Sequence, residues 1–237
     1  MKISKLSSKQ LPAFALASSM AGASNKMATI EKRTFPLYAS LHGETHIALT
    51  RQKQLIFSNE NLVILGNGGI KLPLMLPFVK RPLSCILAVS TMLKIKNLYL
   101  EKNKSISNLE ILMQASLEAT CCYLNHHPMA AELLGKESGF VSFVFDSCLI
   151  GFLGRKNPNE LWEYQEPPKS DNASVIMTFK DMKTAYRGAL GEIDPYVDPA
   201  EKNVLIEGRI PLIEKIGFIS RITLREVPTP RKSQHAV

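Results

Sequence analysis

Cys122 and His126 are the residues whose types and spacing most favour chemistry. They lie four positions apart in a segment whose pattern predicts a helix, so both side chains fall on the same face. With Cys121 and His127 beside them, they offer thiol and imidazole ligands for zinc, or a thiol–imidazole pair for nucleophilic catalysis. The chain has no second ligand pair of matching spacing, and the apolar sequence around the thiols favours unreactive cysteines. We therefore expect a buried structural cysteine beside a solvated histidine, with no metal, no cofactor and no enzymatic activity.

Two further patterns are weak as chemical sites. Gly66–Gly69 lacks the Lys-Ser/Thr pair and the strand-to-helix context of a phosphate-binding loop, so we expect a turn there. Glu160, Glu163 and Glu166 recur every three residues, but their proline-bearing segment predicts solvated charge in a loop rather than an acid–base pair. The four cysteines, two of them adjacent, show no disulfide framework, which favours a reducing compartment.

The net charge of +8 is concentrated in the first part of the chain. Residues 1–104 carry 15 basic and 4 acidic side chains, whereas residues 105–237 carry 14 basic and 17 acidic ones. Nucleic acid is an obvious partner for a basic chain. However, the sequence has no basic stripe interleaved with aromatic residues, and no zinc-finger or recognition-helix spacing. We therefore expect no nucleic-acid partner.

Basic residues surround proline-broken apolar sequence within residues 61–104. The candidates for membrane contact among them are Lys71, Lys80, Arg81, Lys94 and Lys96. Each such group near anionic lipid contributes roughly 1 kcal/mol, and the neighbouring apolar residues would rest on the lipid surface. A solvated face of a helix packed against the domain explains the same pattern equally well. We expect this basic apolar segment to pack on the domain or on a membrane surface.

Residues 1–60 show no sustained hydrophobic period, and we predict a basic, disordered tail or a targeting segment. Within residues 1–30 there is no acid, and Ala21-Gly22-Ala23 is typical of a cleavage site, which together give a weak pattern of a signal or transit segment. The uncharged run Leu83–Leu93 has 11 residues, against the roughly 20 that a membrane span needs. We expect a cytoplasmic or peripheral membrane protein. Residues 228–237 are predicted to be a polar tail.

From residue 105 onward the pattern alternates between helical and extended segments. Apolar residues recur at helical spacing from Leu109 to Leu124, with Ser107 or Asn108 as the cap of this helix. The further elements are predicted, in order, as a short helix over 129–134, strands over 140–145, 149–153 and 173–179, a helix over 181–190, a strand over 203–207 and a helix from 211. Hairpin-linked strands flanked by helices indicate the α+β class.

Three segments in the C-terminal half carry a more specific pattern. They are MTFKDMKTA at Met177–Ala185, GEIDP at Gly191–Pro195 and VLIEGRIPL at Val204–Leu212. Through them, residues 105–227 resemble a sterol carrier protein type-2 domain, and Gly139–Leu153 fits the opening hairpin of that family. The segment Asp198–Asn203 is more polar than the small-residue stretch usual in the family.

The resemblance implies a five-stranded, mostly antiparallel sheet that is covered by helices and encloses an apolar tunnel. It also implies non-enzymatic binding or transfer of a hydrophobic ligand, such as a sterol, a fatty acyl chain or another lipid. The alternative is an accessory factor that presents a lipid or quinone intermediate to biosynthetic enzymes; the resemblance leaves protein partners undefined.

Apolar residues at alternate strand positions, with two from the last helix, could line such a tunnel. The candidates are Val141, Phe143, Phe145, Val175, Met177, Phe179, Val204, Ile206, Ile216 and Ile219. A solidly filled core has the same pattern, so the residues alone leave tunnel and core as alternatives.

Overall fold

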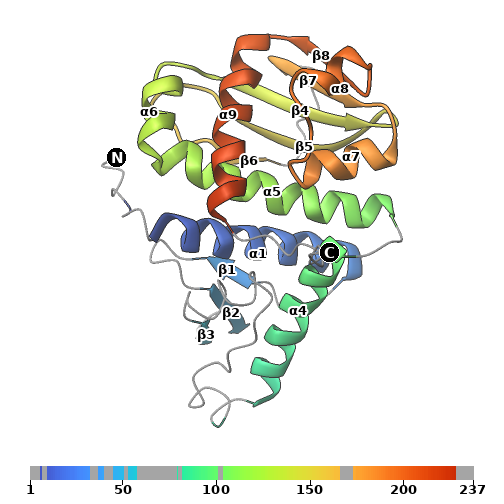
Figure 1. The fold of residues 1–237 in the computed structure, drawn as a ribbon. Coiled ribbons are helices and arrows are strands. Elements are labelled where there is room, and N and C mark those ends of the chain that lie inside the picture. Colours follow the sequence, from blue (N-terminus) through green and yellow to red (C-terminus); the bar gives the residue numbers. More distant parts are fainter. Residues whose placement is uncertain are drawn as a thin grey trace, which may run out of the picture.

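The computed structural model describes residues 10–32, 37–39, 45–50, 53–57, 82–100, 104–165 and 173–227, together with Leu6 and Val79. This part of the chain forms seven helices and two sheets, so the α+β class expected from the sequence is confirmed (Figure 1). The elements are α1 (Gln10–Glu31), β1 (Leu37–Ala39), β2 (Thr45–Thr50), β3 (Lys53–Phe57), α4 (Pro82–Leu100), α5 (Ile106–His126), α6 (Pro128–Leu134), β4 (Gly139–Phe145), β5 (Cys148–Arg155), β6 (Glu163–Tyr164), β7 (Val175–Phe179), α7 (Met182–Ala189), α8 (Val197–Ala200), β8 (Val204–Gly208) and α9 (Ile210–Glu226).

The larger sheet has five strands in the order β6-β5-β4-β7-β8. Only β4 and β7 run parallel, and the other neighbouring strands are antiparallel, so the sheet is mixed. The hairpin between β4 and β5 turns at Asp146 and Ser147, whose φ angles are 50° and 59°. Two successive residues with positive φ are typical of the tight turn that matches the twist of a hairpin. The turn predicted at Asp146-Ser147 is therefore confirmed.

Helix α5 is the central helix of the fold. Its cap is Ser105, whose side-chain oxygen accepts a hydrogen bond of 3.1 Å from the backbone N–H of Asn108. The predicted caps, Ser107 and Asn108, lie instead within the first turn, because the chain becomes helical two residues earlier than the apolar period indicates. Figure 1 shows α5 between the five-stranded sheet on one side and α1 on the other.

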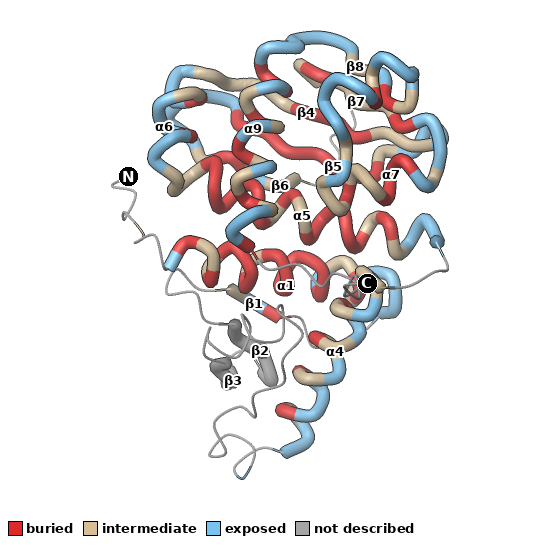
Figure 2. Tube along the Cα trace, viewed as in Figure 1, coloured by how far each residue is buried: buried red, intermediate tan, exposed pale blue. Residues whose placement is uncertain are grey.

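The prediction of a disordered tail over residues 1–60 is wrong for α1. This helix packs along α5 in the most extensive contact between two helices of the described chain, and more than half of its residues are buried. Figure 2 shows the buried positions continuing from α5 into α1. The buried side chains are mostly alanine, serine, glycine and methionine on nearly all sides of the helix, so no apolar stripe marks it in the sequence.

Two polar contacts fasten α1 to its neighbours. The side-chain oxygen of Ser24 accepts a hydrogen bond of 3.1 Å from the backbone N–H of Leu37, which ties β1 to the helix. Lys26 forms an ion pair of 2.9 Å with Glu110 of α5. Strands β1, β2 and β3 form a small antiparallel sheet that contacts α1, and α4 lies beside it. Helices α1 and α4 and strands β1, β2 and β3 thus contribute an integral layer to the described fold.

Gly191, between α7 and α8, permits the close approach of α9. Its φ is +68°, and a Cβ atom at this position would lie 1.8 Å from Cδ1 of Leu224. Glycine is the residue that adopts this backbone conformation without steric cost, and here it also leaves room for the leucine. The end of α7 and the last turns of α9 are therefore held against each other over the sheet.

Candidate functional site

Eight of the ten candidate lining positions fall within β4, β7 and β8, and strand register decides how they meet. Val141 pairs with Val175, Phe143 pairs with Met177, and Phe145 pairs with Phe179. On the other side of β7, Met177 pairs with Ile206, and Phe179 pairs with Val204. Because directly paired residues point to the same face of a sheet, the strand candidates form one continuous apolar surface.

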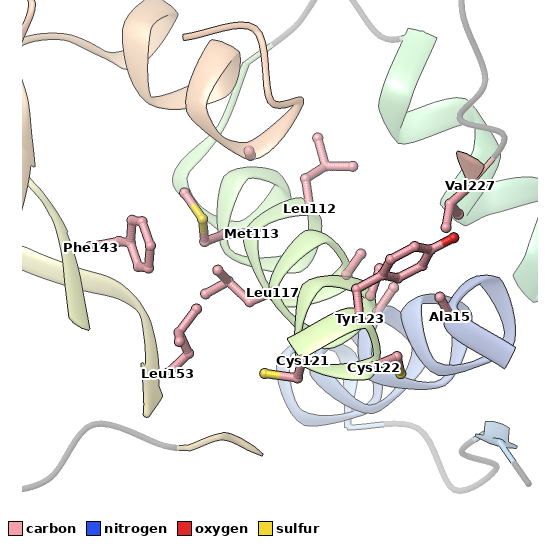
Figure 3. Close-up of a cluster of buried hydrophobic side chains, with 14 of the residues drawn as sticks. Ala15, Leu112, Met113, Leu117, Cys121, Cys122, Tyr123, Phe143, Leu153 and Val227 are labelled. Carbon is pink, nitrogen blue, oxygen red and sulfur yellow. The ribbon is translucent and has the colours of Figure 1, made fainter. Parts of the chain in front are cut away.

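Helices α5, α7 and α9 lie over this surface. Helices α7 and α9 both contact β7, α5 contacts β5, and Ile216 and Ile219 of α9 belong to the same buried core as the strand residues. Figure 3 shows Phe143 and Leu153 of the sheet pointing toward Met113 and Leu117 of α5. The structure therefore brings all ten candidates together in the layer between sheet and helices.

Burial along this surface is uneven. Val175 is 0% exposed, and Phe179 and Val204 are 3% and 2% exposed. Met177 lies between Val175 and Phe179 on the same face, yet it is only half-buried, and so is its partner Ile206. Phe145 is also half-buried. The helix layer thus covers both ends of β7 more completely than its middle.

An apolar cavity of about 30 Å³ lies on the far side of the helix layer. Its walls come from α1, α4, α5, α7 and α9, with Leu16, Met20 and Leu224 among the lining residues. Tyr99 borders it, and burial raises the pKa of this phenol. A volume of this size holds about two water molecules. None of the ten candidate residues lines this cavity.

The candidate membrane residues are only partly placed. Lys71, Lys80 and Arg81 lie outside the described residues. On α4, Lys94 is exposed and Lys96 is half-buried. Among the helices that the structure describes, none combines the length and apolar character needed to cross a membrane.

The first turns of α4 expose apolar side chains that the charge pattern did not single out. Leu83, Ile86 and Leu87 are 76%, 57% and 49% exposed, and they recur at the spacing of one helix face. Val79, just before the helix, is 80% exposed. The signal for this surface was present in the sequence as the uncharged run Leu83–Leu93, which also supplies the buried face of α4.

The structure places Cys122 and His126 at a pocket of about 300 Å³. Burial raises the pKa of the Cys122 thiol to about 12, and it raises the pKa of Cys121 well above its usual range. Both thiols are therefore protonated at neutral pH. Figure 3 shows the two cysteines projecting in different directions from α5. Within the described part of the chain no group of three or more metal-ligating side chains comes together.

Sequence reasoning missed two residues of this pocket, Glu118 and Trp162. Glu118 lies one turn before Cys122 on α5, and Trp162 precedes β6 in the segment that was predicted to be a loop. Trp162 is 1% exposed, so the segment is not a solvated loop throughout, although Glu163 next to it is exposed. The only sequence signal was that Trp162 is the single tryptophan of the chain.

The segment that carries Trp162 is fastened to α5 and to Arg155. Nδ2 of Asn125 donates to the carbonyl oxygen of Trp162, and the backbone N–H of Trp162 donates to Oδ1 of Asn125. The guanidinium carbon of Arg155 lies 4.8 Å from the centre of the Trp162 ring, within the range of a cation–π contact. These contacts fix one wall of the pocket.

Comparison of the sequence with protein-family models gives no match, and comparison with curated protein sequences gives none either.

Proposed function

We propose that residues 105–227 bind a hydrophobic ligand, such as a sterol, a fatty acyl chain or another lipid, without catalysing a reaction on it. In this proposal the domain has the sterol carrier protein type-2 architecture that its sequence resembles, and the ligand lies between the five-stranded sheet and its helices. The observation that carries the proposal is the half-buried pair Met177 and Ile206, flanked on the same face by buried Val175 and Phe179.

This pair supports a route into the interior. A ligand that reaches the sheet between α7 and α9 first meets Met177 and Ile206, and then the buried rows on both sides. Each CH₂ group that moves from water into this interior contributes about 0.8 kcal/mol. Methionine suits such a position because its unbranched, polarizable side chain adapts to ligands of irregular shape. Small movements of α7 and α9 away from β7 would open the volume of roughly 300–1,000 Å³ that ligand sites require.

The test is a displacement titration with a fluorescent fatty acid on the full chain. Met177→Gln and Ile206→Gln place an amide in the proposed route at half-buried positions, where folding tolerates it. Leu205→Gln is the matched control, because Leu205 is the adjacent β8 residue, points to the opposite face and is 57% exposed. We expect the two route variants to weaken binding at least about tenfold, the loss of roughly 1.4 kcal/mol, and the control to bind as the wild type does. Equal affinity of all four proteins would contradict the proposed route.

The exposed apolar face of α4 favours a second element of this function, contact with a membrane surface. Leu83, Ile86 and Leu87 project from a helix that contains no acidic residue. An apolar helix face with basic residues nearby is typical of segments that lie in the interface of a membrane. In this proposal α4 brings the domain to lipid, where the ligand is taken up or presented to biosynthetic enzymes.

A further inference from the structure

A second pocket lies between α1, the C-terminal half of α5, and β6 with the residues that lead into it. Its volume is about 300 Å³, large enough for a small organic molecule. The lining residues are Phe14, Ser18, Glu118, Cys121, Cys122, Asn125, His126, Leu161, Trp162, Glu163 and Tyr164. Neither the apolar interior proposed for lipid nor the exposed face of α4 contributes to it.

Of the acidic side chains and those of lysine and arginine, only acidic ones line this pocket. Glu118 and Glu163 both line the pocket, and no lysine or arginine does. Glu163 is close enough to Glu118 for its charge to disfavour ionisation of the Glu118 carboxyl group. An anionic ligand, such as a fatty acid, would add a third negative charge at this place. A cation would offset the two that are present.

The remaining wall is aromatic. Phe14, Trp162 and Tyr164 come from two separate segments. Trp162 is almost completely buried, so half-buried Phe14 and Tyr164 supply most of the aromatic surface that a ligand in the pocket could contact.

We propose that this pocket binds a small organic cation, namely an alkylammonium ion. The carboxylates of Glu118 and Glu163 offset the positive charge. Phe14 and Tyr164 provide apolar and aromatic surface for the alkyl groups on nitrogen. Because Arg155 already stacks on the Trp162 ring, the carboxylates and not that ring supply most of the attraction for the charge.

The pocket is held in shape before any ligand arrives. The two hydrogen bonds between Asn125 and the Trp162 backbone, each of 2.8 Å, fix the aromatic wall to α5. On the opposite side, a Cβ atom at Gly22 would lie 2.6 Å from Cγ of Glu118, so α1 approaches that side chain closely. A preformed site loses less conformational entropy on binding than a flexible one.

Binding of a cation here depends on pH. Burial, together with Glu163, raises the pKa of Glu118 to about 7, while a hydrogen bond from Gln114 opposes that shift. The carboxyl group is thus largely neutral below this value and ionised above it. A bound cation favours the ionised form, so affinity should rise between about pH 6 and about pH 8, by up to about tenfold.

The other titratable groups around Glu118 do not reverse this direction. On α5 they are Cys121 and Cys122, which stay protonated in this range, and His126. The β6 side contributes Glu163 and Tyr164, and α1 contributes the uncharged Ser18 and Gly22, with Lys26 engaged by Glu110. A variant that removes only the Glu118 charge isolates the contribution of Glu118 to the pH dependence.

The test uses the fluorescence of Trp162, which is the single tryptophan of the chain and lines the pocket. The probe is choline, compared with its neutral isostere in which a tert-butyl group replaces trimethylammonium. We expect choline to bind saturably, and the isostere to bind at least about tenfold more weakly, which is about 1.4 kcal/mol. Phosphocholine distinguishes a lipid head group from a free cation, and its phosphate should weaken binding because it meets two carboxylates.

Two variants complete the design. Glu118→Gln should weaken choline binding about tenfold at pH 8 and abolish the pH dependence that Glu118 contributes. Glu160→Gln is the control, because Glu160 is exposed, lies in the same segment as Glu163 and does not line the pocket. If Glu118→Gln proves unstable in a thermal melt, Glu163→Gln, at an exposed position, serves in its place. Equal binding of choline and the neutral isostere, no saturable choline binding, tighter binding of phosphocholine, or unchanged binding by both acid variants would each overturn the proposal.

Discussion

Asn125 holds the backbone of Trp162 through both ends of its side-chain amide, with hydrogen bonds of 2.8 Å in each direction. The amide thereby pairs with the backbone of Trp162 as a neighbouring strand would. Trp162 lies 37 residues after Asn125 in the chain, in the segment that precedes β6. Asn125→Ala leaves a buried N–H and a buried carbonyl without these partners. We expect the free energy of unfolding to fall by about 2 kcal/mol, since each hydrogen bond contributes about 1 kcal/mol.

Urea denaturation followed by the emission of Trp162 measures this change. Asn157→Ala is the control, because the Asn157 side chain bonds the exposed carboxyl group of Glu160 on the surface. That variant should alter stability by less than about 0.5 kcal/mol. Equal stability of Asn125→Ala and Asn157→Ala would show that the amide does not fasten the segment.

The N-terminal helix α1 should contribute to stability as a core helix does. Met20 is 4% exposed between α1 and the helices around it, whereas Ile30 near the end of α1 is 39% exposed. We expect Met20→Ala to cost about 2–4 kcal/mol, because it leaves a cavity among packed side chains. Ile30→Ala removes a comparable side chain at an exposed site and should cost less than about 1 kcal/mol. Thermal unfolding of both variants decides the matter, and a Met20→Ala protein as stable as the wild type would place α1 outside the folded core.

The four cysteines should differ sharply in reactivity. Cys148 is exposed, whereas Cys85, Cys121 and Cys122 are buried and burial raises the pKa of each thiol. Because the thiolate is the reactive form, a maleimide at neutral pH should label one cysteine in the native protein and all four in denaturant. Cys148→Ser should abolish the native labelling. Rapid labelling of Cys122 in the folded protein would support the nucleophilic thiol that the structure argues against.

The exposed face of α4 gives a direct prediction for lipid surfaces. We expect the chain to float with vesicles that contain anionic lipid, and expect Leu83→Ser combined with Ile86→Ser to reduce the bound fraction severalfold. High salt should weaken the attraction of Lys94 and neighbouring basic residues but leave the apolar part. The matched control is Ile106→Ser, because Ile106 is also exposed, at 41%, but lies at the start of α5. If the double variant floats as well as the wild type, α4 is not the contact surface.

Local patterns predicted the parts of the fold that depend on neighbouring residues. The alternation in Gly139–Phe145 and Val175–Phe179 placed the apolar face of the sheet correctly, because strand geometry alone sends every second side chain to one side. The polar segment from Asp198 also has a local explanation. Asp198 is buried and accepts hydrogen bonds of 2.7 and 2.9 Å from Arg187, so its charge is paired with a residue of α7.

Features that depend on tertiary placement did not follow from the sequence. Helix α1 was not predicted, because its small residues are buried on nearly every side of the helix. Its sequence therefore lacks the periodic alternation of apolar and polar residues that marks an amphipathic helix. The pocket beside Cys122 was not predicted, because Glu118 and Trp162 lie 44 positions apart in the chain. The contacts of Asn125 with Trp162 bring the two residues to the same pocket. Cys122 and His126, which the sequence singled out by their spacing, do line this pocket, and burial raises the pKa of the Cys122 thiol to about 12.

Native mass spectrometry of the full chain, incubated with a mixture of oleate and cholesterol, tests the central claim most directly. The proposed function predicts one bound lipid per wild-type chain, loss of that species in Met177→Gln, and its retention in Leu205→Gln. Choline should not displace the lipid, because the pocket at Glu118 is separate from the sheet face. A wild-type protein that carries no lipid at saturating concentration, while its fold and the control variant are intact, would contradict the account.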